Sequence, residues 1–399
     1  MLTYEPVSKD MMRQMNRSLV LNTVRLKGPI SRADIARVTG LSAASVSGLV
    51  TELIHEDLIF EQEEGNSSGG RRPVLLSLNP SGGYVIGIKL MEDHLIAALT
   101  NLESRVVDSM NAPFTGVEPG EVIQAIADGV AQLLETNAIP PVKLFGVGIG
   151  LAGIVDQNTG ILRLSPIFGW QGLAFGKMIQ EKLQVPVFID NDVNTVTLTE
   201  KWFGIARDID HFLTVTIGRG VGLGIVTNGR LYRGKGGAGE FGHVVVDPDG
   251  PSCPCGKQGC LETYVADPGL VARAQSEGTL QDKVQTIDDL RSLAESGNPA
   301  AKAIYSVAGE TLGRGIASLI NVFDPEMIIL TGEGVKARNL IIESMFKAIK
   351  THTMPGMGSG TNVHIDELED LAWARGAAGL VLRAVFDSPI FKHEMDQIG

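Results

Sequence analysis

The sequence predicts an α/β protein in which an N-terminal winged helix-turn-helix precedes a larger, two-lobed domain. Three observations support this fold class. Residues 12–53 carry helical hydrophobic patterns with capping residues between them. Beyond residue 82, strand-like apolar runs alternate with helical patterns, which is typical of an α/β fold. At 399 residues the chain is too long for one ordinary core, so we expect two or three domains.

The first predicted helix covers residues 12–26, and Gly28-Pro29 ends it. Apolar side chains recur along roughly one face of this helix and are expected to be buried: Met12, Met15, Leu19, Val20 and Val24. This spacing indicates an amphipathic helix that packs against the rest of a small helical module.

Two shorter helices follow, each with recognisable start and stop signals. Ser31 and Asp34 form a capping-box pattern ahead of the second helix, on which Ile35 and Val38 are expected to be buried. Gly40 is expected to end that helix in the left-handed conformation, and Ser42 to cap the third. The third helix has a buried stripe at helical spacing: Val46, Leu49, Val50 and Leu53.

Two short helices joined by a glycine turn match the helix-turn-helix, whose second helix enters the major groove of DNA. The outward-facing residues that open this helix are small and permit close approach to base edges: Ser42, Ala43, Ala44, Ser45 and Ser47. Strand-like runs at 58–60 and 75–78 flank a polar, glycine-rich loop, as expected for a wing. Arg71 and Arg72 in that loop can reach phosphates or a minor groove. The alternative is a three-helix dimerisation or packing module.

The charge distribution is compatible with a DNA-facing module. The formal net charge is -12, which by itself argues against a dedicated nucleic-acid binder. Before residue 40, however, lysines and arginines outnumber acidic residues, so the acidic excess lies in the remainder of the chain. No apolar run approaches the roughly 20 residues of a membrane helix, and the N-terminus lacks a secretory pattern. We therefore expect a cytoplasmic protein without membrane contact.

The larger domain contains a series of strand-like runs, at residues 84–90, 144–149, 185–189, 212–217 and 327–330. Between them, residues 121–134 place four apolar side chains along one helical face: Val122, Ile126, Val130 and Leu133. Strand-turn-strand blocks begin near residue 84 and again near residue 212, which suggests a duplicated, two-lobed architecture.

Three segments are rich in glycine, at residues 148–153, 218–224 and 332–334. Glycine lets backbone amides approach a ligand, but none of these segments has the context of a dinucleotide fingerprint or a Walker lysine. Ligand loops and tight structural turns both remain open for each of them.

A cluster of polar residues, Asp190–Asn194, directly follows an apolar strand, where α/β proteins place ligand-contacting groups. In a kinase-like site a strand-end carboxylate accepts a proton from a sugar hydroxyl, while neighbouring amides and carboxylates hold the other hydroxyls. The alternative is an Asx-rich capped turn.

All three cysteines of the chain lie in one short segment that His243 precedes. One imidazole and three thiols form a complete tetrahedral zinc set: His243, Cys253, Cys255 and Cys260. The absence of a fifth strong ligand and the location in a glycine-rich loop favour a structural zinc ion over a catalytic ion with an open position. Such a loop would hold the flanking Glu240 and Glu262 at fixed positions; three unligated thiols are the alternative.

These motifs together resemble the ROK family of sugar-responsive repressors and sugar kinases, from the N-terminal module to the C-terminus. The matching segments are Gly239-Glu240-Phe241-Gly242-His243 and Cys253-x-Cys255-Gly256-x-x-Gly259-Cys260-Leu261-Glu262. The resemblance implies an actin-like, two-lobed sugar-kinase fold of the ribonuclease H type. The residues that it implies for sugar contact are Asn191, Asp192, Glu240, His243 and Glu262. Asp192 would occupy the kinase base position, and His243 would bind structural Zn²⁺ with the three cysteines.

The nucleotide half departs from the kinases of this family, which open the domain with Asp-x-Gly-Gly-Thr. Residues 89–93 read Lys-Leu-Met-Glu-Asp here, so Lys89 replaces the acidic residue and side chains replace both glycines. Arg219 replaces the small hydroxyl residue of the second phosphate loop, and Glu333 adds an anion to the presumed adenosine loop. We expect a degenerate kinase, and such losses behind a winged helix resemble the repressor branch of the family.

The expected domains are a DNA-binding domain at 1–78, a first lobe at 79–195 and a second lobe with the zinc loop at 196–399, whose C-terminal helix is a candidate to pack back on the first lobe. The resemblance implies operator DNA, a sugar or sugar-phosphate effector and a homodimer or homotetramer, with a sugar-transport protein as a further candidate partner. Gly169 and Trp170 are candidates for sugar contact, although Trp170 fits a buried core position equally well. The alternative function is an ATP-dependent sugar kinase with an accessory DNA-binding domain, which the retained Asp192 supports.

Overall fold

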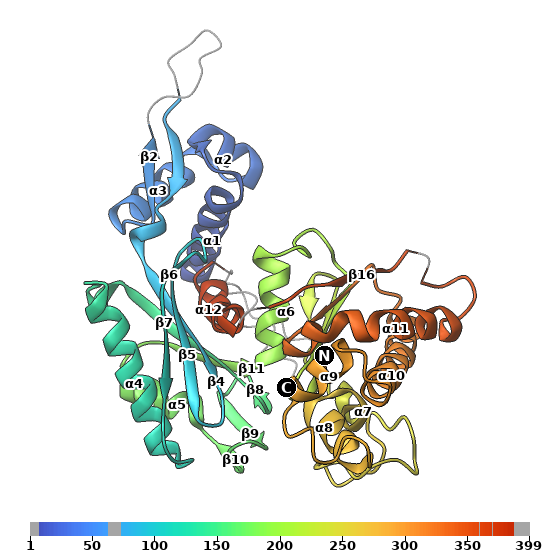
Figure 1. Cartoon of the computed structure of the whole chain (residues 1–399). Coiled ribbons are helices and arrows are strands. Elements are labelled where there is room, and N and C mark those ends of the chain that lie inside the picture. Colours follow the sequence, from blue (N-terminus) through green and yellow to red (C-terminus); the bar gives the residue numbers. More distant parts are fainter. Residues whose placement is uncertain (1–7, 63–72, 359, 369, 387–399) are drawn as a thin grey trace, which may run out of the picture. The chain divides into compact units, whose positions relative to one another are not determined.

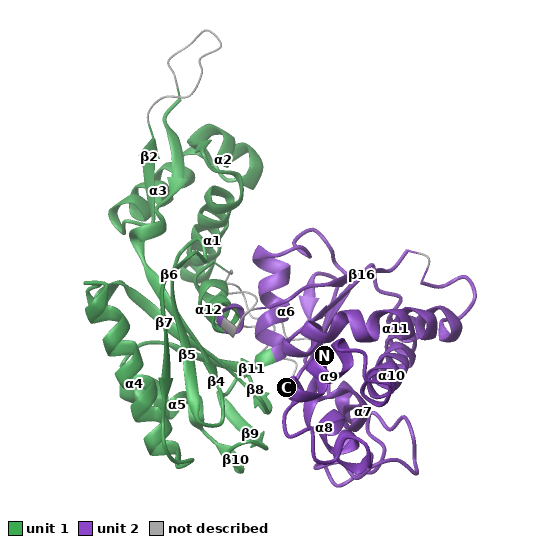
Figure 2. Ribbon diagram, viewed as in Figure 1, with its two compact units in different colours: residues 1–192, 374–399 green, residues 193–373 purple. Residues whose placement is uncertain are grey.

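The computed structural model describes residues 8–62, 73–358, 360–368 and 370–386. The chain divides into two compact units, residues 1–192 with 374–399 and residues 193–373 (Figure 2). Each unit is built around its own five-stranded sheet. Among the described residues, no helix is both long and apolar enough to cross a membrane.

The first unit begins with three helices and a small antiparallel sheet (Figure 1). These elements are α1 (Lys9–Lys27), β1 (Ile30–Ser31), α2 (Arg32–Thr39), α3 (Ala43–His55), β2 (Ile59–Gln62) and β3 (Leu75–Leu78). The strand order is β1-β3-β2, with β3 antiparallel to both neighbours. Three helices followed by a hairpin form a winged helix-turn-helix, as predicted.

The predicted helix ends are confirmed in atomic detail. The Ser31 hydroxyl caps α2 by accepting a hydrogen bond from the Asp34 amide, and Gly40 ends the helix with φ 72°. The Ser42 hydroxyl caps α3 by accepting from the Ser45 amide. Because each cap satisfies orphan backbone groups, short polar residues and one glycine determine where these short helices begin and end.

The predicted burial is right for α3 and partly wrong for α1 and α2. Val46, Leu49, Val50 and Leu53 are all buried, as expected. Met12, Leu19 and Val38, however, are 48%, 43% and 46% exposed, whereas Leu21 is fully buried. A module of three helices covers only one side of each helix, so the buried stripe is narrower than the full apolar face.

The rest of the first unit is a mixed sheet with strand order β11-β7-β4-β5-β6. Its strands are β4 (Tyr84–Leu90), β5 (His94–Asn101), β6 (Val106–Pro113), β7 (Leu144–Leu151) and β11 (Val187–Asn191). β7 and β11 run parallel to β4, whereas β5 is antiparallel to β4 and to β6. A smaller sheet contains β8 (Ile154–Asp156), β9 (Ile161–Ser165) and β10 (Trp170–Leu173).

Helices cover both faces of this sheet. Successive side chains of a strand point to opposite faces, so each face packs against its own helices. On one face, Ile86 and Ile88 join the core formed with α4 (Pro119–Thr136) and α5 (Phe175–Leu183), which contains the four predicted residues of helix 121–134. On the other face, α12 (Asp370–Phe386) approaches Gly87 and Gly148. A Cβ on Gly148 would lie 1.9 Å from the Ala377 carbonyl oxygen, so glycine permits this close packing.

The second unit has a sheet of strand order β14-β13-β12-β15-β16. Its strands are β12 (Phe212–Ile217), β13 (Val221–Thr227), β14 (Arg230–Leu231), β15 (Met327–Thr331) and β16 (Asn362–Ile365). The helices are α6 (Asp192–Phe203), α7 (Glu262–Val265), α8 (Asp267–Ser276), α9 (Ile287–Glu295), α10 (Pro299–Phe323) and α11 (Arg338–His352), and short 3₁₀ turns η3 (Phe241–His243) and η4 (Glu333–Ala337) lie between them.

The main core of this unit lies between β12, β13, β15 and the helices α8 to α11. α6 packs on the opposite face, where a Cβ on Gly222 or Gly224 would collide with Val193 or Thr197. Two glycines of the 218–224 segment therefore permit helix packing, which is the structural alternative left open for that segment.

Candidate functional site

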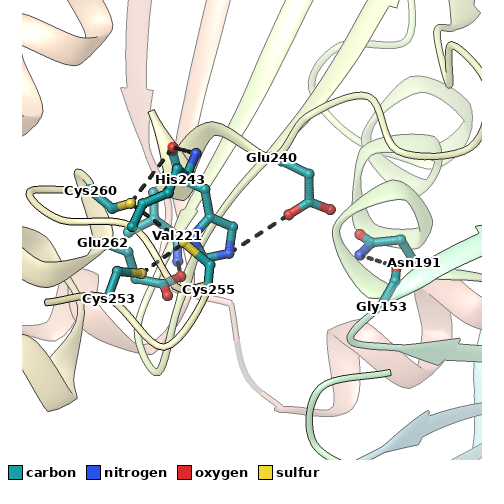
Figure 3. A network of polar contacts seen from close by, with 10 residues as sticks. Gly153, Asn191, Val221, Glu240, His243, Cys253, Cys255, Cys260 and Glu262 are labelled. Carbon is teal, nitrogen blue, oxygen red and sulfur yellow. Dashed lines mark hydrogen bonds and ion pairs between the residues drawn. The ribbon is translucent and has the colours of Figure 1, made fainter. Parts of the chain in front are cut away.

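The second unit brings the four predicted metal ligands into one cluster (Figure 3). His243 ends the turn η3, and the cysteines lie on a compact loop held by bridges between Val245 and Cys260 and between Ser252 and Gln258. Gly259 has φ 64°, and a Cβ there would lie 1.4 Å from the Asp247 carbonyl oxygen. The loop can therefore close around the cluster only with glycine at this position.

The spacing of the ligand atoms fits a tetrahedral zinc site. The four ligand atoms of His243, Cys253, Cys255 and Cys260 lie within 4.8 Å of one another. Cys255 Sγ and Cys260 Sγ are 3.7 Å apart, and Cys253 Sγ is 3.6 Å from His243 Nδ1. Ligands about 2.3 Å (S) and 2.0 Å (N) from a zinc ion at tetrahedral angles would lie roughly 3.5–3.8 Å from one another.

The electrostatics of the cluster also suit a cation. Burial raises the pKa of Cys253, and it raises the pKa of Cys260 to about 12, with the neighbouring thiols adding to that effect. A hydrogen bond from the Lys257 amide lowers the pKa of Cys255. Three crowded sulfurs cannot all ionise without a compensating positive charge. A divalent ion supplies that charge, and the thiols that coordinate it lose their protons.

His243 connects the cluster to Glu240. Since Nδ1 faces the sulfurs, Nε2 is directed away from them and lies 4.0 Å from Glu240 Oε2 (Figure 3). This separation is longer than a direct hydrogen bond. Lys257 Nζ donates to the His243 carbonyl oxygen at 2.7 Å and so fixes the backbone of this residue, a contact that the sequence did not indicate.

Glu262 opens α7 two residues after Cys260, the last cysteine of the loop. One of its carboxylate oxygens accepts a hydrogen bond from the Val221 amide at 3.2 Å. A Cβ on Gly220 or Gly242 would lie 3.1 or 3.0 Å from the same oxygen. Glycines on both sides thus make room for this carboxylate, and the zinc loop and β13 fix its position.

Asn191 and Asp192 lie in the first unit, where β11 ends. The Asn191 amide nitrogen Nδ2 donates to the Gly153 carbonyl oxygen at 3.1 Å, and the buried Asp190 accepts from the Asn191 backbone amide (Figure 3). These hydrogen bonds orient both polar side chains of the strand end. Asp192 begins α6, so its carboxylate lies at the positive end of a helix dipole.

Trp170 lies in the core of the first unit, which is the alternative that the sequence left open. Its side chain is 8% exposed and stacks on Phe168 at 4.3 Å between ring centroids. Its indole nitrogen donates to the Val117 carbonyl oxygen at 2.8 Å. Phe168 thus covers one face of the indole ring, and the Phe175 ring lies 5.0 Å from it at a tilt of 49°. The adjacent Gly169 is exposed, with φ 70° and open space around it.

The predicted DNA-facing residues divide into described and undescribed positions. The five small residues that open α3 are all exposed: Ser42, Ala43, Ala44, Ser45 and Ser47. Arg71 and Arg72 lie outside the described residues. Arg13 and Arg17 of α1 form ion pairs with Glu52 and Glu56 of α3, which fix these two helices together.

The segments expected to handle nucleotide carry side chains instead of open backbone. Lys89 is 4% exposed within β4, and the Met91 amide closes a tight turn by donating to the His94 carbonyl oxygen. A Cβ on Gly218 would lie 2.4 Å from Glu333 Oε2. The Glu333 carboxylate therefore lies against the glycine turn that the resemblance assigns to phosphate.

Comparisons with known proteins agree with this architecture. The ROK family model matches residues 85–384. The xylose repressor of Bacillus spizizenii is 33% identical over 378 residues, which cover 94% of this chain and 97% of the repressor. A solved ROK family transcriptional regulator, a homologue of the E. coli MLC protein, superposes with a TM-score of 0.84 at 29% identity and covers 96% of this chain and 99% of its own.

A solved ROK family glucokinase from Streptomyces griseus, in complex with glucose and AMPPNP, gives a TM-score of 0.66 at 26% identity. It covers 75% of this chain but 99% of its own length. The part of the chain that the glucokinase does not cover corresponds to the winged helix-turn-helix, which precedes residue 85, where the match to the family model begins. The chain belongs to the ROK family, on the repressor branch with the xylose repressor of Bacillus spizizenii.

Proposed function

We propose that this chain is a DNA-binding transcriptional repressor whose ROK domain binds a sugar or sugar-phosphate effector. The observation that carries the proposal is the winged helix-turn-helix of α1 to α3 ahead of the kinase-like domain. Relatives with repressor names align with this N-terminal region as well, whereas the glucokinase covers 75% of the chain. We assign DNA binding to residues 1–78, with Ser42, Ala43, Ala44, Ser45 and Ser47 at the bases and Arg71 and Arg72 on the backbone.

The residues that we propose for sugar contact are Asn191, Asp192, Glu240, His243 and Glu262, together with the backbone of Gly169. Carboxylates and amides bind sugar hydroxyls through directional hydrogen bonds, and those described here are held by backbone partners. The Nε2 of His243 points away from the cysteine cluster, so a zinc ligand can also donate to a hydroxyl. The zinc ion is proposed to be structural, because four protein ligands complete its coordination.

A kinase is the second candidate, and Asp192 at the base position is the feature that favours it. Lys89 and Glu333 oppose the kinase. Lys89 is buried at the position where kinases of the family have the acidic residue that handles magnesium. Glu333 brings a carboxylate to the turn at Gly218, which the resemblance assigns to phosphate. Adjacent negative charges repel a triphosphate by Coulomb's law. We therefore propose that the domain senses a sugar without phosphorylating it efficiently.

Helix α12 is the element that we propose to couple the sugar to DNA. Near its start, Trp373 packs with Val193 and Val196 of α6, the helix that Asp192 begins. At its end, Phe386 lies under the Arg25 guanidinium at 5.0 Å and accepts a hydrogen bond from Asn22 through its carbonyl oxygen. Arg25 and Asn22 belong to α1, the first helix of the winged module. A shift of α6 on sugar binding would thus reach the DNA-binding module through one rigid helix.

The remaining partners follow from this function. We propose that the chain acts in the cytoplasm as a homodimer or homotetramer on operator DNA. A sugar-transport protein is an alternative controller, and an intact sugar site that binds no monosaccharide would favour it.

The proposal is tested by fluorescence anisotropy on DNA from the upstream region of the chain's own gene, at fixed salt, with a panel of free and phosphorylated sugars. A coupling of about 1–3 kcal/mol would change DNA affinity roughly 5- to 150-fold. Sugar-dependent release of specific DNA supports the repressor, and ATP-dependent sugar phosphorylation that Asp192→Asn abolishes would instead establish the kinase.

A further inference from the structure

Asp57 lies in the turn that follows α3, the helix proposed to meet the bases. Its φ is 61°, in the left-handed region that glycine adopts without a steric penalty and that costs free energy for a residue with a side chain. Glycine is the usual residue directly after the C-cap of a helix. An aspartate held in this conformation is therefore explained by the groups that its oxygens bind.

All three oxygens of Asp57 accept hydrogen bonds from outside the helix. The backbone carbonyl oxygen and Oδ1 accept from the Asn79 side-chain nitrogen Nδ2 at 2.9 and 2.8 Å, and Oδ2 accepts from Lys143 Nζ at 3.1 Å. Lys143 Nζ also donates to the Ser81 carbonyl oxygen at 3.1 Å. Asn79 and Ser81 lie in the connection between β3 and β4, and Lys143 ends the turn η2 (Pro141–Lys143) of the first lobe. Asp57 thus links the winged module, the connection and the lobe.

The connection packs closely against this turn. Gly82 lies in η1 (Pro80–Gly82), and a Cβ there would lie 2.1 Å from the Asp57 carbonyl oxygen. The Leu102 amide donates to the Pro80 carbonyl oxygen at 3.2 Å, which holds the same segment against the turn between β5 and β6. Lys143 directly precedes β7, an interior strand of the five-stranded sheet, so its backbone is anchored in the first lobe.

These contacts act on orientation more than on stability. The side chains of Asp57 and Lys143 are 59% and 37% exposed, and exposed ion pairs contribute little to the free energy of unfolding. A short connection, however, rotates about its backbone dihedral angles unless other contacts restrain it. The hydrogen bonds to Asn79 and Ser81 supply that restraint on both sides of the connection.

We propose that Asp57 and Lys143 are positioning residues for DNA binding, which restrain the connection at 79–83 and so fix the direction of α3 relative to the first lobe. This inference rests on the proposed repressor function. In a homodimer, two winged modules meet two half-sites of an operator at once, and a stiff attachment of each module strengthens the second contact. Nonspecific DNA requires no such spacing, so a looser connection weakens specific binding selectively.

Fluorescence anisotropy of the full chain on a duplex from the upstream region of its own gene, and on a scrambled duplex of the same length, tests the proposal. Asp57→Gly keeps the left-handed turn and removes both carboxylate contacts, so the variant should fold. We expect it to bind the upstream duplex about fivefold or more weakly, with little change on the scrambled duplex or in thermal midpoint. Lys143→Met should behave alike, and Lys143→Arg should retain the wild-type affinity because it keeps the cation. The matched control is Lys177→Met, which breaks an exposed ion pair with Glu181 on α5 of the same lobe and should change neither affinity.

Two further measurements isolate the contact itself. Because Asp57→Gly and Lys143→Met break the same contact, the double variant should bind the upstream duplex no more weakly than either single variant. Hydrogen exchange of the full chain without DNA should be faster at 79–83 in Asp57→Gly than in wild type or Lys177→Met.

Unchanged affinity of Asp57→Gly for the upstream duplex, an equal loss on both duplexes, additive losses in the double variant or unchanged exchange at 79–83 would each overturn this inference alone. Absence of specific binding by the wild-type chain would overturn the repressor function and this inference with it, so the two failures are distinguishable.

Discussion

Replacing Cys255 by serine tests the zinc cluster most sharply. Cys255 is exposed and is the thiol whose pKa is lowered, so the change removes a ligand while disturbing the core little. Binding of structural zinc is worth about 10–16 kcal/mol at neutral pH, or roughly 2.5–4 kcal/mol for each of the four ligands. Since 1.4 kcal/mol is a factor of ten, Cys255→Ser should weaken zinc binding by about 10²–10³-fold.

The assay is competition with a chromophoric zinc chelator, after elemental analysis of the purified chain. We expect one zinc ion per wild-type chain, loss of zinc from the variant at lower chelator concentration, and a lower thermal midpoint. Ser252→Ala is the matched control, since Ser252 is an exposed residue of the same loop and is not a ligand. Equal zinc affinity in wild type and Cys255→Ser would refute the four-ligand site.

Three further predictions concern packing, pH and coupling. Gly148→Ala should destabilise the chain by roughly 1–3 kcal/mol in denaturant titration, because its Cβ would collide with the Ala377 carbonyl oxygen and push α12 off the sheet. An unchanged midpoint would contradict this packing. The pKa of Asp267 is about 6 in the folded chain against an ordinary value of 3.8, because burial disfavours the charged carboxylate. The protonated carboxyl is therefore tolerated in the fold below pH 4, and the resulting stability is lost as the pH rises through 6. Asp267→Asn should therefore raise stability by roughly 1–3 kcal/mol at pH 8 and leave it unchanged at pH 4, and an equal effect at both pH values would argue against the shift. Arg25→Met removes the cation over the Phe386 ring and should reduce the effect of sugar on DNA affinity severalfold, as measured by anisotropy. Sugar affinity, measured by calorimetry, should not change. An undiminished effect of sugar on DNA affinity would exclude this contact as part of the coupling.

The elements that the sequence predicted best are those with local signals. Ser31, Gly40 and Ser42 determine helix ends through hydrogen bonds within a few residues, so their spacing was sufficient. The zinc ligands could also be predicted, because His243 and Cys260 are separated by one short loop, and one imidazole with three thiols at that spacing has few other uses. The predicted strand at 84–90 coincides with β4 for a similar reason, as its residues form one continuous buried run.

What the sequence could not predict depends on contacts between distant segments. Trp170 had the same local pattern as a sugar-stacking residue, and only Phe168 and the Val117 carbonyl oxygen assign it to the core. Leu19 and Val38 carry the right periodicity, but periodicity does not say which part of an apolar face a neighbour covers.

The long-range features that bear on function were invisible for the same reason. Contact between Phe386 and α1 joins residues 364 positions apart, and no local pattern links them. The ion pair between Asp57 and Lys143 joins the winged module to the first lobe across 86 positions. The Glu333 carboxylate was recognised as an anion in a glycine loop, but its position against Gly218 depends on the pairing of β12 with β15.

The anisotropy of the full chain on its own upstream DNA, measured with and without each sugar of the panel, decides whether the chain is a sugar-responsive repressor. We expect specific binding at physiological salt that one sugar or sugar phosphate changes at least fivefold, with that response lost in Asp192→Asn or Glu262→Gln. Absence of specific DNA binding under every condition, or binding that no sugar alters, would contradict the proposed repressor.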